Sequence, residues 1–428
     1  GQSSRRWALC GLPRLEALAE PLADVEAIAE PLADLEALAE PSGELLAERE
    51  SEQSAVTEGR ARDSGRIGVV LLNIGTPAST DVEDVRAYLA KFLSDERVIE
   101  MDDPEARQAV IQALLKSSPA KSAEAYRKIW HPERGSPLLY HTEDLAASLR
   151  TELGSEYEVC IGFQYSEPSV ETALLRLMSL SISNIVLVPM YPHFAQATGA
   201  SFLANTCKVA AEVDCRAYLQ VVRPFYKNPG YIDAAAPIIA EHVGPQGRNV
   251  DHVVFSFHGI PEDQCSRTDE TGTVCMKVPD CCRNRSAANR NCYRAQCLET
   301  AELLAGALDL SEGHWSVAFQ SRASVRGSIR WTQPFTDEHL QRLAREGKKR
   351  VAICAPSYTA DCIETLGELG NDGREIFQAA GGDELTVIPC INSSEVWGQN
   401  LAQMIRDMPR TVEEAVRRAG SATDFWAM

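Results

Sequence analysis

Short apolar runs alternate with amphipathic stretches along most of the chain. The first run, residues 67–75 (IGVVLLNIG), is continuously apolar and rich in β-branched side chains. Such a run is typical of a strand that is buried on both faces of a parallel sheet. Similar runs recur, and the pattern predicts further strands at 158–163, 184–190, 252–258, 315–321, 350–356 and 385–389.

Helical patterns follow most of these strands. Thr80 to Glu83 has the spacing of a capping box and predicts the start of an amphipathic helix that continues through Phe92. Further helices are expected over 170–178, from about residue 199, and over 360–369. Strands that alternate with helices in this way predict parallel sheets with helices on both faces.

The length of the chain predicts two such units. A chain of 428 residues is long for one domain and typical of two. Residues 225–249 are expected to cross from one unit to the other. We therefore predict two doubly wound, Rossmann-like α/β domains over residues 66–240 and 241–410, with parallel sheets and a cleft between the lobes.

The two ends of the chain differ from this pattern. Three ten-residue units run from Leu15 to Glu44 and contain prolines at 21, 31 and 41, which limit any helix to about two turns. Residues 1–65 carry roughly eight of the nineteen net negative charges, so we expect an acidic, disordered tail. Residues 411–428 are expected to form a short C-terminal tail.

Composition and charge exclude some classes of function. Hydrophobic residues make up 44% and charged residues 24% of the chain, which is typical of a globular protein. The net charge of −19 disfavours nucleic acid as a partner, because binding a phosphate backbone needs a basic surface. The sequence has no apolar run of about 18 residues, so no segment is expected to span a bilayer.

His258 is the first candidate for chemistry. It ends the predicted strand 252–258, and Gly259 and Pro261 force a turn directly after it. Ligands of open α/β sheets bind beyond the carboxyl ends of the strands, and an imidazole exchanges protons near neutral pH. From its position alone, His258 is equally consistent with proton transfer and with a hydrogen bond that only caps the strand.

A row of carboxylates is the second candidate. On a helix, Asp361, Glu364 and Glu368 would share one face, and Asp372 would continue it. Like charges at this spacing repel unless a cation or a proton compensates them, which suits a route for metal or protons. Acidic helix faces are common, so the pattern alone favours a solvated surface over a metal or proton route by about two to one.

The third candidate is a group of cysteines. Six of the thirteen cysteines lie within 33 residues, at positions 265, 275, 281, 282, 292 and 297. Nearby arginines, at 283, 285, 290 and 294, are expected to lower the pKa of the thiols and offset the charge of a cluster. A [2Fe–2S] cluster, a structural zinc and free cysteines are all open interpretations, and the density of cysteines disfavours the last.

Several motifs, in this order, resemble the ferrochelatase family, whose members insert ferrous iron into a porphyrin. The resemblance covers residues 67–405. The motifs are LLNIGTP (71–77), ERGSPL (133–138), GFQYSEPSV (162–170), VPMYPHFAQATGAS (188–201), FSFHGIP (255–261), FQSR (319–322), WTQPFTDE (331–338), DCIETLGEL (361–369) and VIPCIN (387–392). The resemblance implies a porphyrin in the cleft between two α/β lobes. It also favours a functional role, over a purely structural one, for His258 and for the acidic row.

The resemblance also implies roles for individual residues. His258 takes the place of the family's active-site histidine and Glu364 that of its essential glutamate, so the Fe²⁺ substrate is expected there. Asp361, Glu368 and Asp372 are expected to continue a route for protons or metal. Ser136, Tyr165 and Tyr191 fall in motifs that line the porphyrin pocket.

The choice of porphyrin rests on one position. Ile74 stands where enzymes that use coproporphyrin often have tyrosine, which favours protoporphyrin IX. Coproporphyrin III, cobalt insertion into a sirohydrochlorin-type ring, and a non-catalytic iron or redox sensor stay open as alternatives. We expect a monomer or homodimer in the cytoplasm, with peripheral membrane contact through the apolar lips of the cleft.

The same resemblance favours iron–sulfur for the cysteines. Residues from about 266 to 291 are an insertion after the histidine motif, within the cysteine-rich segment 265–297, and some bacterial ferrochelatases hold a [2Fe–2S] cluster through such a segment. Cys275, Cys281, Cys282 and Cys292 are the expected ligands. Because adjacent thiolates are awkward as joint ligands, Cys265 or Cys297 could replace one of the pair.

Overall fold

A computed structural model of the chain describes residues 64–322, 329–411, 414, 417 and 418. Nearly all of the predicted acidic tail and most of the predicted C-terminal tail lie outside these residues.

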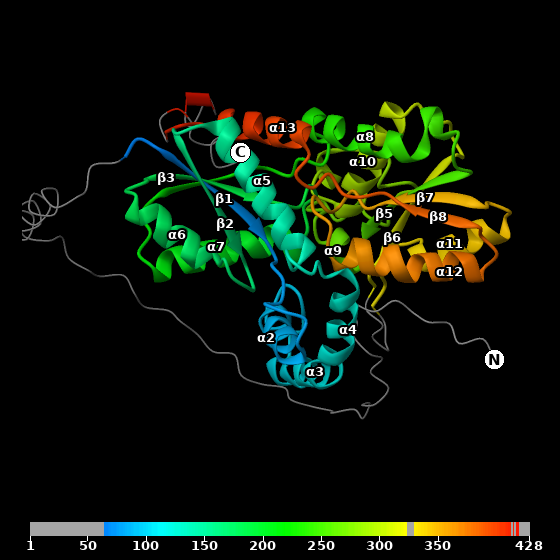
Figure 1. Cartoon of the computed structure of the whole chain (residues 1–428), viewed down its shortest axis with the longest axis horizontal. Helices are drawn as coiled ribbons and strands as arrows, with labels where there is room; N and C mark the ends of the chain where they lie inside the picture. The colour runs from blue at the N-terminus through cyan, green and yellow to red at the C-terminus, as the bar shows by residue number, and fades with distance from the viewer. Residues whose placement is uncertain (1–63, 323–328, 412–413, 415–416, 419–428) are drawn as a thin grey trace, which may run out of the picture.

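Two four-stranded parallel sheets form the centres of two lobes (Figure 1). The first has the order β2-β1-β3-β4, from β1 (Ile67–Asn73), β2 (Tyr157–Phe163), β3 (Asn184–Pro189) and β4 (Tyr218–Val221). The second has the order β6-β5-β7-β8, from β5 (His252–His258), β6 (Trp315–Gln320), β7 (Arg350–Cys354) and β8 (Glu384–Val387). Every pairing is parallel, which confirms the predicted doubly wound α/β class.

The predicted strands match the observed ones to within a few residues, except that β4 was missed. Its sequence, YLQV, is short and contains a glutamine, and most of its side chains are only half-buried. The sheet pairs it through the backbone with β3, from Asn184 opposite Tyr218 to Leu187 opposite Val221. Backbone pairing of this kind leaves little trace in the pattern of side chains.

Helices flank both sheets. In the first lobe these are α5 (Pro137–Leu153), α6 (Val170–Ser179) and α7 (Ser201–Glu212), which follows the short π-helical turn η2 (Gln196–Ala200). The second lobe has α8 (Pro229–Val243), the short α9 (Glu262–Ser266), α10 (Tyr293–Ala307), α11 (Thr336–Arg345) and α12 (Arg374–Ala379). The predicted crossing segment 225–249 is therefore largely helix α8, and the proposed division at residue 240 falls inside it.

Three helices project from the first lobe, below both sheets in Figure 1: α2 (Val82–Leu93), α3 (Pro104–Ser117) and α4 (Pro119–Ile129). The predicted capping box before α2 was wrong. Asp81 is the N-cap residue, and its side chain makes no capping hydrogen bond. Instead, the Ser79 hydroxyl accepts from the Asp81 amide and donates to Asp84 at 2.5 Å, so a different side chain organises this turn.

The predicted helix after β7 forms, but with another geometry. Residues Ile363–Gly373 make a π-helix, η5, whose hydrogen bonds join residues five apart. Asp361 lies before this helix, and Cys362 at its N-cap is extended. The prediction that Asp361 shares a helix face with Glu364 and Glu368 was therefore wrong.

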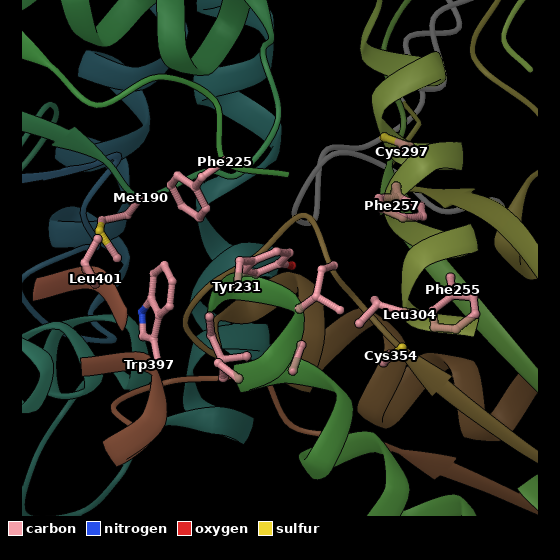
Figure 2. Close-up of a cluster of buried hydrophobic side chains, with 14 of the residues drawn as sticks. Met190, Phe225, Tyr231, Phe255, Phe257, Cys297, Leu304, Cys354, Trp397 and Leu401 are labelled. Carbon is pink, nitrogen blue, oxygen red and sulfur yellow. The ribbon is translucent and has the colours of Figure 1, made fainter. Parts of the chain in front are cut away.

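A large hydrophobic core joins the two lobes (Figure 2). The final helix, α13 (Glu395–Arg406), packs against α5 of the first lobe and α8 of the second. Its Trp397 is fully buried against Phe225 and Tyr231, at ring-centre distances of 5.5 and 6.0 Å. Each large side chain buried in this way contributes about 1.5–3 kcal/mol, so the core holds the lobes at a defined distance.

In the described residues, no helix is long and apolar enough to cross a lipid bilayer.

Candidate active site and cysteine cluster

A cavity lies where the carboxyl ends of the two sheets face each other. Its wall in the first lobe contains Asn73 to Thr76 after β1, and Met190 and Tyr191 after β3. Its wall in the second lobe contains Tyr358 to Ala360 after β7 and Cys362 to Glu364 at the start of η5. Strands β1 and β3 are neighbours whose connections leave in opposite directions, and ligands of open α/β sheets bind at such a point.

His258 lies at the end of β5, half-buried and outside the lining of the cavity. Its ring centre is 6.4 Å from that of Tyr358, which lines the cavity. The Nδ1 atom lies 2.6 Å from the Gly259 carbonyl oxygen, and because a carbonyl can only accept, Nδ1 carries the proton. Nε2 is then the basic nitrogen of the ring, with a lone pair for a proton or a metal ion.

The environment of His258 keeps it neutral. Burial lowers its pKa, while the charge of Glu364 and the hydrogen bond to Gly259 act in the opposite direction without cancelling the effect. An uncharged imidazole beside a carboxylate can accept a proton at neutral pH. His258 therefore has the protonation state that a general base needs.

Glu364, Glu368 and Asp372 form a row along η5. Glu364 lines the cavity. The charges of Glu364 and Asp372 both raise the pKa of Glu368. Burial is the main reason that the pKa of Glu368 lies well above its usual value, followed by the charge of Glu364. Burial therefore favours the protonated form of the Glu368 carboxyl, whose charge interacts with that of Glu364 at the cavity wall.

One oxygen of Glu368 is bound and the other is not. Its Oε2 accepts a hydrogen bond from the Ser321 hydroxyl at the end of β6. Its Oε1 is buried and has no hydrogen-bond partner among the described residues. A buried carboxyl oxygen without a partner is costly, and here it marks a place where a proton, a water molecule or a metal ion could be bound.

Asp361 has a different environment from the rest of the row. Its carboxylate accepts hydrogen bonds from the Thr365 hydroxyl and the Asn392 amide, both at 2.8 Å, and from the Cys390 amide at 3.3 Å. The residue is 4% exposed. Asp361 thus ties the start of η5 to the loop after β8, and its oxygens are already engaged.

The three predicted pocket residues do not share one location. Ser136 and Tyr191 line the cavity, and the Ser136 hydroxyl accepts from Thr76 at 2.8 Å. Tyr165 is not among the lining residues. Its hydroxyl donates to Asp95 at 2.8 Å, and its ring packs edge-on against Phe92, which does line the cavity.

Other lining residues were missed by the sequence analysis. They are mainly aromatic or hydroxyl side chains of the projecting helices and of the loop after β7: Tyr88, Phe92, Ser122, Tyr126 and Tyr358. Tyr358 stands next to the predicted acidic row and could have been found there. The residues of α2 and α4 follow ordinary amphipathic patterns, so no signal in the sequence separates them from core residues.

Five cysteines lie together in the segment between β5 and α10. Cys265, Cys275, Cys281, Cys282 and Cys292 are all buried, and the Cys281 and Cys282 sulfurs are 3.8 Å apart. The Cys292 thiol interacts with the thiols of both Cys265 and Cys282. No cysteine in the described part of the chain forms a disulfide.

Cys297 is one turn further along α10 and is fully buried, where its thiol interacts with the Tyr293 hydroxyl. In residues 64–322 and the described stretches after them, no three histidine, cysteine or acidic side chains are placed so that one metal ion could bind them together. The thiols instead contact one another in pairs. Buried neighbouring thiols of this kind are the donors from which iron–sulfur sites are built.

The arginines were expected to lower the pKa of these thiols, and the charge of Arg294 does lower that of Cys282, but the interaction with Cys292 and burial outweigh it. Arg283 and Arg285 form ion pairs with Glu302, and Arg285 also with Glu299, while Arg294 approaches the Cys282 sulfur at 3.9 Å. Burial raises the pKa of Cys275 to about 12, and mainly its interaction with Cys265 raises that of Cys292 to about 11. The thiols of Cys275 and Cys292 are thus protonated, and their ligation would release protons.

Asp269 organises the loop that carries Cys275. Its carboxylate accepts hydrogen bonds from the Thr271 hydroxyl at 2.6 Å and from the amides of Val274 and Cys275 at 2.8 Å. These bonds to the charged form place the pKa of Asp269 well below its usual value. The loop therefore has a fixed shape around Cys275.

Fold and site together define a two-lobed α/β protein whose ligand cavity joins the carboxyl ends of both sheets, beside a half-buried histidine and a row of carboxylates. The chain belongs to the ferrochelatase family, because the family model described as Ferrochelatase matches residues 66–408. A ferrochelatase of Pseudomonas fluorescens (strain Pf0-1) is 40% identical over 342 residues, which cover 80% of this chain and 98% of that protein. One of Bdellovibrio bacteriovorus is 39% identical over 345 residues, covering 80% of this chain and all of that protein.

Among solved structures, SirB from Bacillus subtilis with Fe³⁺ matches with a TM-score of 0.47 and 11% identity, over 83% of this chain and 98% of that one. Similarity at this level carries nothing about activity. Membership of the ferrochelatase family supports a metal-chelatase, that is, a lyase that inserts a metal ion into a porphyrin. Ferrous iron and a porphyrin are the substrates that this relation indicates.

Proposed function

We propose that the protein inserts Fe²⁺ into protoporphyrin IX to form protohaem, with His258 and Glu364 as catalytic residues. The observation that supports this most is the arrangement of a half-buried imidazole and a buried carboxyl group at one cavity. Neutral His258 lies outside the lining of the cavity, and Glu364 lies in that lining and acts electrostatically on His258. Insertion replaces two pyrrole N–H protons by one metal ion, so the site needs a base and a way out for protons.

His258 is the base in this proposal. Its Nδ1–H is held by the Gly259 carbonyl, so Nε2 is the atom that accepts a pyrrole proton or transiently binds Fe²⁺. Glu364 stabilises the resulting imidazolium by its charge. Glu368 and Asp372 extend the route away from the cavity, and the Ser321 hydroxyl at Glu368 provides a further hydrogen-bonding step.

Asp361 is not a relay in this scheme, because its oxygens are already bound. It fixes the first turn of η5 and so the place of Glu364. Ser136 and Tyr191 contact the porphyrin directly, while Tyr165 supports Phe92 from behind. Ile74 lines the cavity, which puts an apolar side chain against the ring and is the basis for proposing protoporphyrin IX over coproporphyrin III.

The test is an iron-insertion assay with both porphyrins. We expect His258→Ala and Glu364→Gln each to lower kcat by about 10²-fold or more, the usual loss for a group that transfers protons. Glu375→Gln, in α12 and outside the cavity lining, is the matched control and should retain activity. Near-normal insertion by either active-site variant would refute the assignment of residues, and a marked preference for coproporphyrin III would refute the choice of substrate.

We also infer that the clustered thiols bind a [2Fe–2S] cluster through Cys275, Cys281, Cys282 and Cys292, with Cys265 close enough to Cys292 to replace one of the adjacent pair. When bound, such a cluster supplies one-electron redox chemistry and a structural tie. The chain's own contribution is the buried thiols, the Asp269 turn that fixes Cys275 and the Arg294 guanidinium beside Cys282.

Metal analysis and the visible absorption spectrum of the purified protein test this site. We expect iron and sulfide in equal amounts, and loss of the spectrum on serine substitution at each ligand. Zinc without sulfide would refute the iron–sulfur assignment. For the cellular setting we propose the cytoplasm, with peripheral contact to a membrane through the rim of the cavity, which flotation with liposomes would detect.

A further inference from the structure

Tyr293 connects the cysteine segment to the strand that ends at His258. It is the first residue of α10 and directly follows Cys292. Its side chain is 5% exposed, and its hydroxyl donates to the His258 carbonyl oxygen at 2.8 Å. The His258 amide donates to the Ser357 hydroxyl at 3.1 Å, so side chains from two other segments hold both backbone groups of His258.

The start of α10 is held firmly in place. The Gln296 side chain accepts from the Phe194 amide at 2.8 Å and donates to the Arg290 carbonyl at 2.9 Å. The Cys292 amide donates to the Asn289 carbonyl at 3.0 Å. The first turn of α10 is therefore tied to the segment after β3 on one side and to the cysteine segment on the other, and close-packed groups transmit small shifts.

We propose that Tyr293 is a positioning residue that couples the state of the cysteine cluster to His258. The inference rests on the proposed function, because it takes His258 as the base. The Tyr293 hydroxyl already holds the His258 carbonyl while the thiols are free, and ligation of Cys292 would further restrain the residue that precedes Tyr293. Without ligation, Cys292 loses this restraint, and the peptide next to the Gly259 carbonyl is held less firmly. That carbonyl sets the direction in which His258 Nε2 points.

A comparison of two hydroxyl deletions tests the positioning role. The rings of Tyr293 and Tyr226 both contact the His193 ring, at centre distances of 5.8 and 5.9 Å, but the Tyr293 hydroxyl is the one that binds His258. We expect Tyr293→Phe to lower kcat about tenfold, because a slightly misdirected base is costly. The KM and the binding of iron-free protoporphyrin, followed by its fluorescence, should stay within about twofold, with the cluster spectrum intact. Tyr226→Phe should leave kcat unchanged.

The coupling itself is tested by removing the cluster in two backgrounds. Cys275→Ser should lower kcat severalfold when it is introduced into the wild-type chain. Introduced into Tyr293→Phe, it should change kcat by less than about twofold, because the hydrogen bond from Tyr293 to His258 is already missing there. Removing the cluster iron with a chelator from the wild-type chain and from Tyr293→Phe allows the same comparison of kcat. It does not depend on the folding of the serine variant. The proposal would be overturned if the fold-losses in kcat of the two single variants multiplied in the double variant. It would also be overturned if Tyr293→Phe had the kcat of the wild-type chain.

Hydrogen exchange provides a measurement that does not depend on turnover. Amides of residues 258–264 should exchange faster after iron removal in the wild-type chain and should be equally fast, with or without iron, in Tyr293→Phe. Equal responses of the two proteins to iron removal would contradict the coupling. A wild-type chain that shows this exchange pattern but inserts no iron would refute the proposed function and leave the coupling standing.

Discussion

The pKa values of His258 and Glu368 move in opposite directions from their usual values. Burial lowers the pKa of the imidazole and raises that of the carboxyl, since each loses hydration of its charged form. The charge of Glu364 acts on both groups and raises the pKa of each. A base whose pKa is lowered and an acid whose pKa is raised, both coupled to one carboxylate, are a suitable arrangement for moving protons away from a porphyrin.

Glu368→Gln tests whether the Glu368 carboxyl takes part in proton transfer, because it replaces that carboxyl by an amide. The amide has nearly the same shape as the protonated carboxyl, so we expect the melting temperature to change little or to rise slightly. Because the amide cannot release a proton, kcat for iron insertion should fall by about 10²-fold. An unchanged kcat in a steady-state assay would show that protons leave by another route.

His252 and His339 belong to a second buried network, behind the sheet of the second lobe. Arg342 donates to His339 Nδ1 at 2.8 Å, so His339 Nε2 carries the proton and donates to Ser316 at 2.6 Å. The Ser316 hydroxyl in turn donates to His252 at 2.8 Å. Burial lowers the pKa of both histidines to about 4, so both rings are neutral in the folded protein.

This network predicts a loss of stability in mild acid. A histidine whose pKa is lowered by folding contributes its full stabilisation above its ordinary pKa of about 6.5 and loses it as the pH falls towards 4. Urea unfolding should therefore show a falling free energy of unfolding between pH 6.5 and 4. His252→Gln, which can accept the same hydrogen bond but does not titrate, should reduce that slope, and an unchanged slope would contradict the assignment.

At the scale of elements, the π-helix η5 decides where the carboxylates lie. Its first turn is held by Asp361, which joins Thr365 to Asn392 and to the backbone after β8. Glu364 follows this anchored point directly and therefore reaches the cavity wall at a fixed place. π-helical turns are rare and are often found at functional sites, in agreement with this role.

Thr365→Val tests whether this anchor matters. The substitution keeps the shape but removes the hydroxyl that donates to Asp361 and accepts from the Cys362 amide, so buried groups are left without a partner. We expect a loss of about 1–3 kcal/mol in the free energy of unfolding and a lower kcat. Thr386→Val in β8, whose hydroxyl makes only a 3.4 Å contact, is the control and should change little.

At the scale of the whole molecule, one shared core makes the two lobes a single unit. Helix α13 comes last in the fold, after both sheets, yet it packs against α5 and α8, and its Leu401 and Trp397 lie near Met190 and Phe225 (Figure 2). The cavity depends on this contact, because its walls belong to different lobes. Unfolding of one lobe would expose the core of the other.

Leu401→Ala should therefore destabilise the entire protein. The side chain is fully buried, and truncation of a core leucine costs about 2–5 kcal/mol. We expect fluorescence and circular dichroism to follow one common urea transition that is shifted to lower concentration. Val396→Ala, on the same helix but 44% exposed, should shift it little. Separate transitions for the two lobes would contradict a shared core.

The sequence by itself determined the α/β class, nearly every strand, and the positions of His258, Glu364 and the clustered cysteines. Buried strands must be apolar, and residues at their carboxyl ends face the ligand in any parallel sheet, so both features are local. The nine motifs in family order also identified the family, and the family match confirmed it.

Only the tertiary structure decided which of these residues work together. Asp361 leaves the acidic row because partners distant in sequence, Cys390 and Asn392, bind its oxygens. The Tyr165 hydroxyl is bound by Asp95 and does not line the cavity. Burial raises the pKa of the Cys275 thiol, while two of the nearby arginines pair with glutamates. Hydrogen bonds and desolvation depend on neighbours in space, and the order of residues along the chain does not record them.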